Sequence, residues 1–405
     1  MNPVRIGSVL VAGMLVLVAG CTGSSSGTAS PTTTAAAGSS TRFHDPDVRP
    51  LPAPRAKALQ EVLDELVTLE AQVPGAGASG VTAAVVSDHG GWTGAAGTDG
   101  FGVRLRPETV MLIASITKTF LAAEVLHLVA MGRVDIDAPL SRYVSDPRAA
   151  NGATVRQTLA MRGGFRDKAG ADIDEVIRGA AAQPHRHWTA RDSLSAWSGA
   201  STKPGELEYT SVGYMLLGLL VERVTGRSVA QSLRADLFGP AGLRRIAAQD
   251  AERPPAPLAS ASRKLGIDSP DGYLPGRSLA SLGNASSSGI AADAATIATW
   301  GYHLYGGRIL PATLTKAMIT SPSQETLGGG TGYGLGTMVF DGMATDLAAG
   351  HLGDLAGYDS ILVVVPAREL SIAVLTVAGP HRDPFVSGAS GRLEEIARNL
   401  LRALT

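Results

Sequence analysis

The sequence predicts an α/β (α+β) fold of two lobes, in which an antiparallel sheet flanked by terminal helices carries an inserted helical lobe. Four short runs are predicted to be strands and lie near the two ends of the chain, at residues 80–87, 91–96, 358–365 and 370–377. Helical spacing of apolar residues precedes the first pair and follows the second, at residues 55–70 and 391–404. We therefore expect an α/β lobe of about residues 54–104 and 346–405, and a helical lobe of about residues 105–345.

The elements of the α/β lobe are predicted from their apolar patterns. One face of the first helix carries Leu59, Val62, Leu63, Leu66 and Leu69. One face of the last helix carries Leu393, Ile396, Ala397, Leu400 and Leu401. The β-branched runs 358–365 and 370–377 lie on either side of Pro366, which predicts a hairpin.

The elements of the helical lobe are predicted from longer apolar runs. Residues 111–132 are apolar, with Lys118 the only charged residue between Glu108 and Glu124, and are predicted to form a buried helix that ends at Gly132. Further helices are expected at residues 212–225, 291–305 and 311–319. Residues 165–205 are polar and are predicted to be a surface excursion, while residues 249–285 are predicted to be rich in loops.

The first 20 residues have the features of a targeting segment. Arg5 supplies a positive charge before the apolar residues 7–20, which are too few to span a bilayer. The segment ends in Val18-Ala19-Gly20-Cys21, which resembles the bacterial lipoprotein signal. Residues 1–20 are therefore predicted to be a signal peptide and Cys21 to be lipidated, an ordinary signal peptide with a chance cysteine being the alternative.

A flexible tether is predicted after this signal. Residues 21–53 are rich in Ser, Thr and Pro, a composition typical of linkers. The folded domain, residues 54–405, would then be held at the outer, extracytoplasmic face of the cell membrane by the lipid anchor. Whether that membrane is the inner or the outer one stays open.

Composition limits the classes of partner. The chain has 405 residues, 44% of them hydrophobic, which suffices for a sizeable core. Its 35 Lys and Arg balance 36 Asp and Glu, so the charge gives no reason to expect a nucleic-acid partner. Cys21 is the only cysteine, which excludes a disulfide within the chain. No cofactor or metal is implied, and the oligomeric state stays open.

The lone ammonium at Lys118 draws attention to Ser115, three residues before it. This spacing places both side chains on one face of a helix. A hydroxyl beside a desolvated lysine is the arrangement of an activated nucleophile. The alternative is structural, with Ser115 capping the helix and Lys118 extending to solvent, but the apolar flanks of Lys118 disfavour a wet position.

Three motifs in order resemble those of the serine β-lactamase and DD-peptidase superfamily, nearest its class C-like branch, over about residues 75–380. Ser115-Ile116-Thr117-Lys118 matches S-x-x-K. Tyr209-Thr210-Ser211 matches the Tyr-x-Asn region, and His351-Leu352-Gly353 matches the Lys/His-x-Gly strand. Tyr333-Gly334-Leu335-Gly336 is a lesser similarity. The resemblance implies the two-lobed fold of that family and a serine hydrolase.

The resemblance also implies roles for these residues. Ser115 would attack a carbonyl and form an acyl-enzyme, with Lys118 as the base. Tyr209 would relay a proton to the leaving group, and the nearby Lys118 would favour its anion. The backbone N–H groups of Ser115 and Asp354 would form the oxyanion hole, and His351 would contact the distal end of the substrate. Ser211 and Gly353 complete the predicted substrate-binding residues.

Two departures from the family pattern bear on the substrate. Ser211 stands where Asn is usual, and it offers fewer hydrogen-bonding groups. Asp354 follows Gly353 where small neutral residues are common, and its charge would repel a substrate carboxylate. Both departures disfavour efficient cleavage of β-lactams and D-Ala-D-Ala peptides, and they favour esters or other substrates without that carboxylate. They also motivate a competing hypothesis, a non-catalytic lipoprotein that binds cell-wall fragments or a protein partner.

Overall fold

The computed structural model describes residues 42–73, 78–169, 171–261, 272–320, 325–327, 331–377 and 390–405. The predicted signal peptide, Cys21 and most of the predicted tether lie outside these residues. In the described part of the chain, no helix combines the length and the apolar character that crossing a membrane requires.

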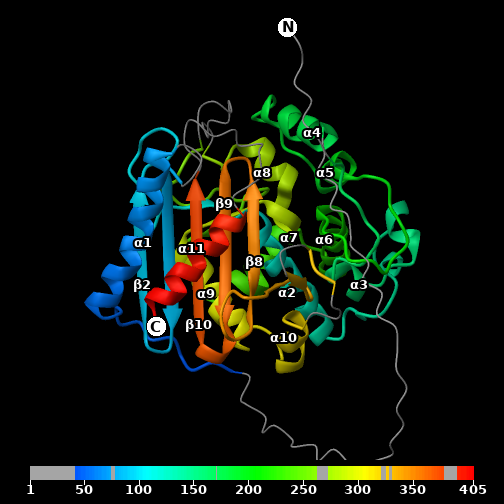
Figure 1. Ribbon diagram of the computed structural model, residues 1–405. Helices are drawn as coiled ribbons and strands as arrows, with labels where there is room; N and C mark the ends of the chain where they lie inside the picture. Colours follow the sequence, from blue (N-terminus) through cyan, green and yellow to red (C-terminus); the bar gives the residue numbers. More distant parts are fainter. Residues whose placement is uncertain are drawn as a thin grey trace, which may run out of the picture. The chain divides into compact units, whose positions relative to one another are not determined.

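Within the described residues, seven strands form an antiparallel sheet in the order β2-β1-β10-β9-β8-β7-β6 (Figure 1). The strands are β1 (Gly80–Ser87), β2 (Gly90–Gly97), β6 (Gly332–Tyr333), β7 (Met338–Phe340), β8 (Ala348–Leu355), β9 (Tyr358–Val365) and β10 (Leu370–Val377). β9 and β10 pair from Tyr358 with Val377 to Val365 with Leu370, which confirms the predicted hairpin. β1, from the start of the chain, pairs with β10 near its end, so the sheet joins the two terminal segments.

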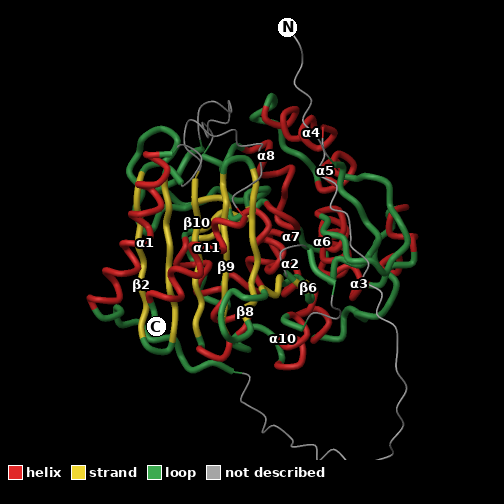
Figure 2. The backbone as a smooth tube through the Cα atoms, in the orientation of Figure 1, coloured by secondary structure: helices red, strands yellow, loops and turns green. Residues whose placement is uncertain are grey.

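Helices cover both faces of this sheet, which explains why β9 and β10 are buried at every position rather than at alternate ones. α1 (Ala53–Gln72) and α11 (Ser390–Ala403) lie on one face, and α9 (Ala294–Tyr305) lies on the other (Figures 1 and 2). The apolar stripes predicted for the terminal helices are largely buried, with Leu59 and Leu63 of α1 and Leu400 of α11 fully enclosed. The α/β part of the prediction is confirmed.

The remaining helices gather beyond β8, on the side of the sheet away from β2 (Figure 1). They are α2 (Thr117–Ala130), α3 (Val155–Leu159), α4 (Ala171–Ala181), α5 (Ala190–Trp197), α6 (Ser211–Thr225), α7 (Val229–Leu233), α8 (Arg277–Gly283) and α10 (Ala312–Met318). α2 packs against α6, and both contact the π-helical turn η6 (Asn284–Ser288). In the described residues a second sheet has the order β3-β5-β4, formed by Met111–Leu112, Ile290–Ala292 and Ile246–Ala248.

The structure departs from the predicted elements in two places that matter for the site. Residues 111–132 are not one helix, because Met111 and Leu112 join the small sheet and α2 begins at Thr117. Residues 165–205, predicted as a surface excursion, contain α4 and α5, which both pack against α8, and α5 also packs against α6. Short apolar segments carry too weak a periodicity to separate a strand from a helix start.

Candidate active site

The nucleophile candidate lies in a strained turn between the small sheet and α2. Ala114 has a φ of 45°, a left-handed backbone that is uncommon for a residue with a Cβ. Ser115 follows it within the 3₁₀ turn η1 (Ala114–Ile116), and its side chain remains partly exposed. The left-handed residue interrupts the predicted helix and turns Ser115 out of the core. Backbone strain of this kind clusters at functional sites.

Lys118 lies in the first turn of α2 and its side chain is fully buried. Its Nζ atom donates to neutral acceptors: Ser115 Oγ at 3.0 Å, the backbone oxygen of Ser287 at 3.2 Å and, at the limit of hydrogen bonding, Ser211 Oγ at 3.5 Å. Burial lowers the pKa of Lys118 from 10.5 to about 7, while the charge of Asp167 acts in the opposite direction. A substantial fraction of the lysine is therefore the free amine near neutral pH, able to accept the Ser115 proton.

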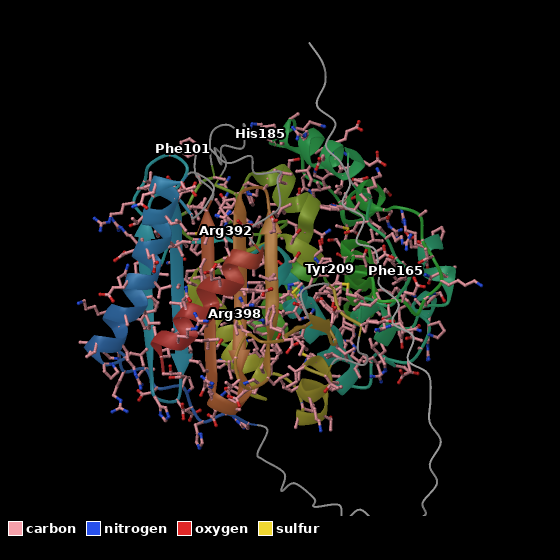
Figure 3. All side chains as sticks on the ribbon, in the orientation of Figure 1. Phe101, Phe165, His185, Tyr209, Arg392 and Arg398 are labelled. Carbon is pink, nitrogen blue, oxygen red and sulfur yellow. The ribbon has the colours of Figure 1, made fainter. Side chains whose placement is uncertain are left out.

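Tyr209 lies between β8 and the neighbouring helices, just before α6 (Figure 3). Lys118 Nζ is 5.0 Å from the centre of its ring. Burial raises the pKa of Tyr209 above its ordinary value, although a hydrogen bond with Ser115 acts to lower it. The sequence predicts a tyrosine anion favoured by Lys118, but desolvation has the largest effect on the pKa of Tyr209 and the charge of Asp167 acts in the same direction, so Tyr209 keeps its proton at neutral pH. A protonated phenol beside Ser115 can donate to a leaving group.

Ser211 is the first residue of α6, and its side chain is almost fully buried. The Asp167 carboxylate accepts hydrogen bonds from the N–H groups of Ser211 and Val212, at 2.8 Å and 2.9 Å, and from the Thr210 hydroxyl at 2.7 Å. The Ser211 hydroxyl thus faces Lys118 while its backbone is held by Asp167.

His351 on β8 is fully buried and does not lie on an open surface of the site. Its Nε2 atom is 3.1 Å from the Tyr333 hydroxyl, and Nδ1 contacts the backbone oxygen of Leu352. Burial, reinforced by the charge of Lys118, lowers the pKa of His351 to about 3. His351 is therefore neutral at neutral pH and supplies no positive charge for a substrate carboxylate.

Gly353 brings β8 against the turn that carries Ser115. A Cβ atom at this position would lie 2.4 Å from the backbone oxygen of Ile113 and 3.0 Å from the backbone nitrogen of Ser115. Only glycine permits this approach without moving the turn. Ser360, the cross-strand partner of Gly353, donates its hydroxyl to the same Ile113 oxygen at 2.8 Å. Asp354 follows directly, so the structure brings the two segments of the predicted oxyanion hole together.

The described residues contain one group with the spacing of a metal site, and it lies elsewhere. Ligand atoms of His44, Asp88 and Glu369 all fall within 4.8 Å of one another. Ser360, near the start of β9, contacts the turn that carries Ser115. Glu369 comes after the opposite end of β9, away from that turn. His44 Nδ1 is 3.0 Å from Glu369 Oε1, so an ordinary ion pair accounts for their proximity when the histidine is protonated.

The geometry around Ser115 agrees with an independent comparison of the whole sequence. The family model described as Beta-lactamase matches residues 59–391. The chain belongs to the beta-lactamase family.

Curated relatives in this family carry several activities in their names. Esterase EstB of Burkholderia gladioli is 29% identical over 166 residues, which is 35% of this chain and 38% of the esterase. Penicillin-binding protein 4 of Amycolatopsis lactamdurans is 28% identical over 156 residues, 36% of this chain and 37% of that protein. The aligned part of the chain thus spans well under half the length of these relatives.

Solved structures agree on the fold. D-amino acid amidase from Ochrobactrum anthropi SV3, complexed with L-phenylalanine, superposes with a TM-score of 0.71 at 24% identity, covering 87% of this chain and 98% of the amidase. The octameric penicillin-binding protein homologue from Pyrococcus abyssi superposes with a TM-score of 0.65 at 20% identity, covering 85% and 76%. At these identities the likeness establishes the two-lobed fold and no activity.

Sequence reasoning missed three contributors to the site. Asp167 lies in the stretch predicted as a surface excursion, and a single acidic residue there has no distinguishing pattern. Ser287 contributes only its backbone oxygen, which no residue type signals. Tyr333 belongs to the noted Tyr-Gly-Leu-Gly similarity, where its contact with His351 was not anticipated.

Proposed function

We propose that this beta-lactamase family protein is a serine hydrolase that cleaves an ester or amide bond through an acyl-enzyme on Ser115. The observation that carries the proposal is the 3.0 Å hydrogen bond between Lys118 Nζ and Ser115 Oγ, with the lysine fully buried among neutral partners. An alcohol needs an adjacent base to become a nucleophile, and a desolvated amine provides one.

In the first step the Ser115 oxygen attacks the substrate carbonyl while its proton passes to Lys118. The backbone N–H groups of Ser115 and Asp354 stabilise the oxyanion. Tyr209, which keeps its proton, donates it to the leaving alcohol or amine, and the phenol is restored by the proton on Lys118. Water then hydrolyses the acyl-enzyme by the same groups in reverse, releasing the acid and free Ser115.

The charges around the site support a substrate without a carboxylate near the scissile bond. His351 is neutral, because its pKa lies at about 3. The nearby acidic residues are Asp167, which accepts hydrogen bonds from the start of α6, and Asp354, which follows Gly353 on β8. These two carboxylates would repel a carboxylate on the substrate, and the neutral His351 would not offset that repulsion. The esterase among the relatives points in the same direction.

We expect short-chain p-nitrophenyl esters to be hydrolysed faster than nitrocefin or D-Ala-D-Ala peptides when the three are compared at equal concentration. Steady-state kcat/KM for each substrate, with Ser115→Ala as the blank, is the measurement. Faster turnover of nitrocefin or the peptide would contradict the assignment to carboxylate-free substrates. Absence of any turnover by well-folded wild type, together with fragment binding that survives Ser115→Ala, would favour the non-catalytic alternative.

We further propose that Cys21 is lipidated and anchors the domain to the outer face of the membrane. Wild type expressed in bacteria with radiolabelled palmitate is expected to acquire the label and to partition into Triton X-114, whereas Cys21→Ser does neither. A Cys21→Ser variant that still carries the label would contradict the proposal.

A further inference from the structure

The Asp167 carboxylate is bound to the start of α6 by several hydrogen bonds. Both of its oxygens lie within 2.9 Å of the Ser211 backbone nitrogen, and Oδ1 also accepts from Val212 N–H and from the Thr210 hydroxyl. The first N–H groups of a helix have no partner within the helix and carry a positive partial charge. A carboxylate from a separate segment thus satisfies the first turn of α6.

Residues 209–211, at the start of this helix, carry two of the groups that contact Lys118. Tyr209 and Ser211 flank Thr210, whose hydroxyl binds Asp167. The Tyr209 ring lies 5.0 Å from Lys118 Nζ, and Ser211 Oγ lies 3.5 Å from it. A displacement of the Thr210 backbone would therefore move both groups relative to the base.

The carboxylate also acts on Lys118 through its charge. Nζ contacts neutral oxygens and the faces of Tyr209 and Tyr214, at 5.0 Å and 5.9 Å from the ring centres. His351, which also faces it from β8, is neutral. An ammonium formed in this buried place is costly without a counter-charge. Among these groups Asp167 supplies that counter-charge, and its Coulombic effect raises the pKa of Lys118.

We infer that Asp167 is a positioning residue for the hydrolysis reaction. It holds the turn of Tyr209 and Ser211 against Lys118 and stabilises the ammonium that Lys118 becomes when Ser115 attacks. The inference rests on the proposed role of Lys118 as base.

The test separates the charge of Asp167 from its hydrogen bonds. Asp167→Asn removes the charge and keeps an oxygen acceptor for the α6 amides. Without the carboxylate Lys118 loses its proton more easily, so the acidic limb of the kcat/KM profile shifts to lower pH, by about half a unit or more. The plateau falls on the order of 10-fold, because the protonated lysine is less stabilised in the transition state.

Two control variants define what a structural role alone would do. Thr210→Val removes a hydrogen bond to Asp167 and keeps the charge, so it lowers the melting temperature and leaves the acidic limb in place. Glu208 precedes Tyr209 in the chain, and its carboxylate pairs with Arg166 at 2.6 Å. Glu208→Gln removes this carboxylate and should also leave the acidic limb of the kcat/KM profile in place. An acidic limb at the wild-type pH in folded Asp167→Asn would overturn the charge role.

A second measurement does not depend on turnover. The chain has six lysines, so the Lys118 resonance can be assigned in ¹³C-lysine-labelled protein by its loss in Lys118→Met. It is expected to titrate at lower pH in Asp167→Asn than in wild type, and an unchanged titration would overturn the inference. If the Asn variant does not fold, Asp167→Ser keeps an oxygen acceptor and carries the same expectation.

The same experiments distinguish a failure of the proposed function. An acidic limb that persists in Lys118→Ala, or a folded wild type that hydrolyses none of the substrates, would refute Lys118 as the base. The titration of Lys118 would still show whether Asp167 supplies its counter-charge.

Discussion

Ser115→Ala is expected to abolish covalent labelling by a fluorophosphonate probe and to lower kcat/KM for the best ester by on the order of 10³-fold or more. The nucleophilic oxygen is lost, and neither Lys118 nor Tyr209 can replace it at the same carbonyl. The fold should be retained, because the turn is set by the left-handed Ala114 and by the close approach of Gly353, neither of which needs the Ser115 hydroxyl. Mass spectrometry of labelled protein and steady-state kinetics are the measurements.

Ser193→Ala is the matched control. Ser193 is a fully buried serine on α5 that donates its hydroxyl to the backbone oxygen of Ser281, away from Lys118. This variant should be labelled at the wild-type rate. A fluorophosphonate adduct on Ser115→Ala, mapped to another serine, would refute Ser115 as the nucleophile.

Lys118→Met is expected to lower kcat/KM by about 10²- to 10⁴-fold while making the protein more stable at neutral pH. Methionine has a similar length and no charge to desolvate, and replacing a buried ionisable group by an apolar one of similar volume is often stabilising. The loss of rate follows because the Ser115 proton then has no acceptor. The measurements are ester kinetics and the free energy of unfolding from urea titrations.

The effect of Lys118→Met on stability depends on pH, in a direction that follows from the pKa of Lys118. The pKa of Lys118 is about 7 in the folded protein, against its ordinary value of 10.5. Between these values the unfolded chain binds a proton that the folded protein does not. This group therefore makes wild type more stable as pH rises through that window, by up to roughly 1.4 kcal/mol per pH unit, and its destabilising effect is complete once the pH has fallen to the folded pKa of about 7. Lys118→Met loses that slope, so its advantage in stability is greatest at about pH 7 and below and shrinks as pH rises toward 10.5.

Lys316→Met is the control for a lysine on an exposed position of α10. It should change neither the rate nor the slope of stability with pH. If Lys118→Met were instead less stable than wild type at pH 7, the buried amine would be contributing more through its hydrogen bonds than its desolvation costs. That result would contradict a lowered pKa as the basis of the proposed mechanism.

Most of the α/β lobe follows from local pattern. The apolar stripes of α1 and α11 and the β-branched residues of β9 and β10 are properties of short segments, and the structure buries the same segments that these patterns predict. The errors fall at segment starts. Met111 and Leu112 are strand residues ahead of a helix because they pair with Ala292 and Ala291, far along the chain.

In the candidate site, too, some contacts follow from the local sequence and others depend on the tertiary structure. Ser115 and Lys118 are three residues apart, so the sequence by itself determined that their side chains meet, and the structure places them 3.0 Å apart. The positions of Asp167 at α6 and of Ser287 behind Lys118 depend on contacts across the tertiary structure. So does the neutral state of His351, whose pKa falls because the fold removes it from water.

The sequence thus determined which side chains can carry the chemistry, because periodicity and motif spacing act over a few residues. Only the tertiary structure decided their protonation, since burial and distant charges set each pKa. Tyr209 keeps its proton and Lys118 readily loses one for the same reason: the enclosure of the site makes each charge costly unless an opposite charge lies near it.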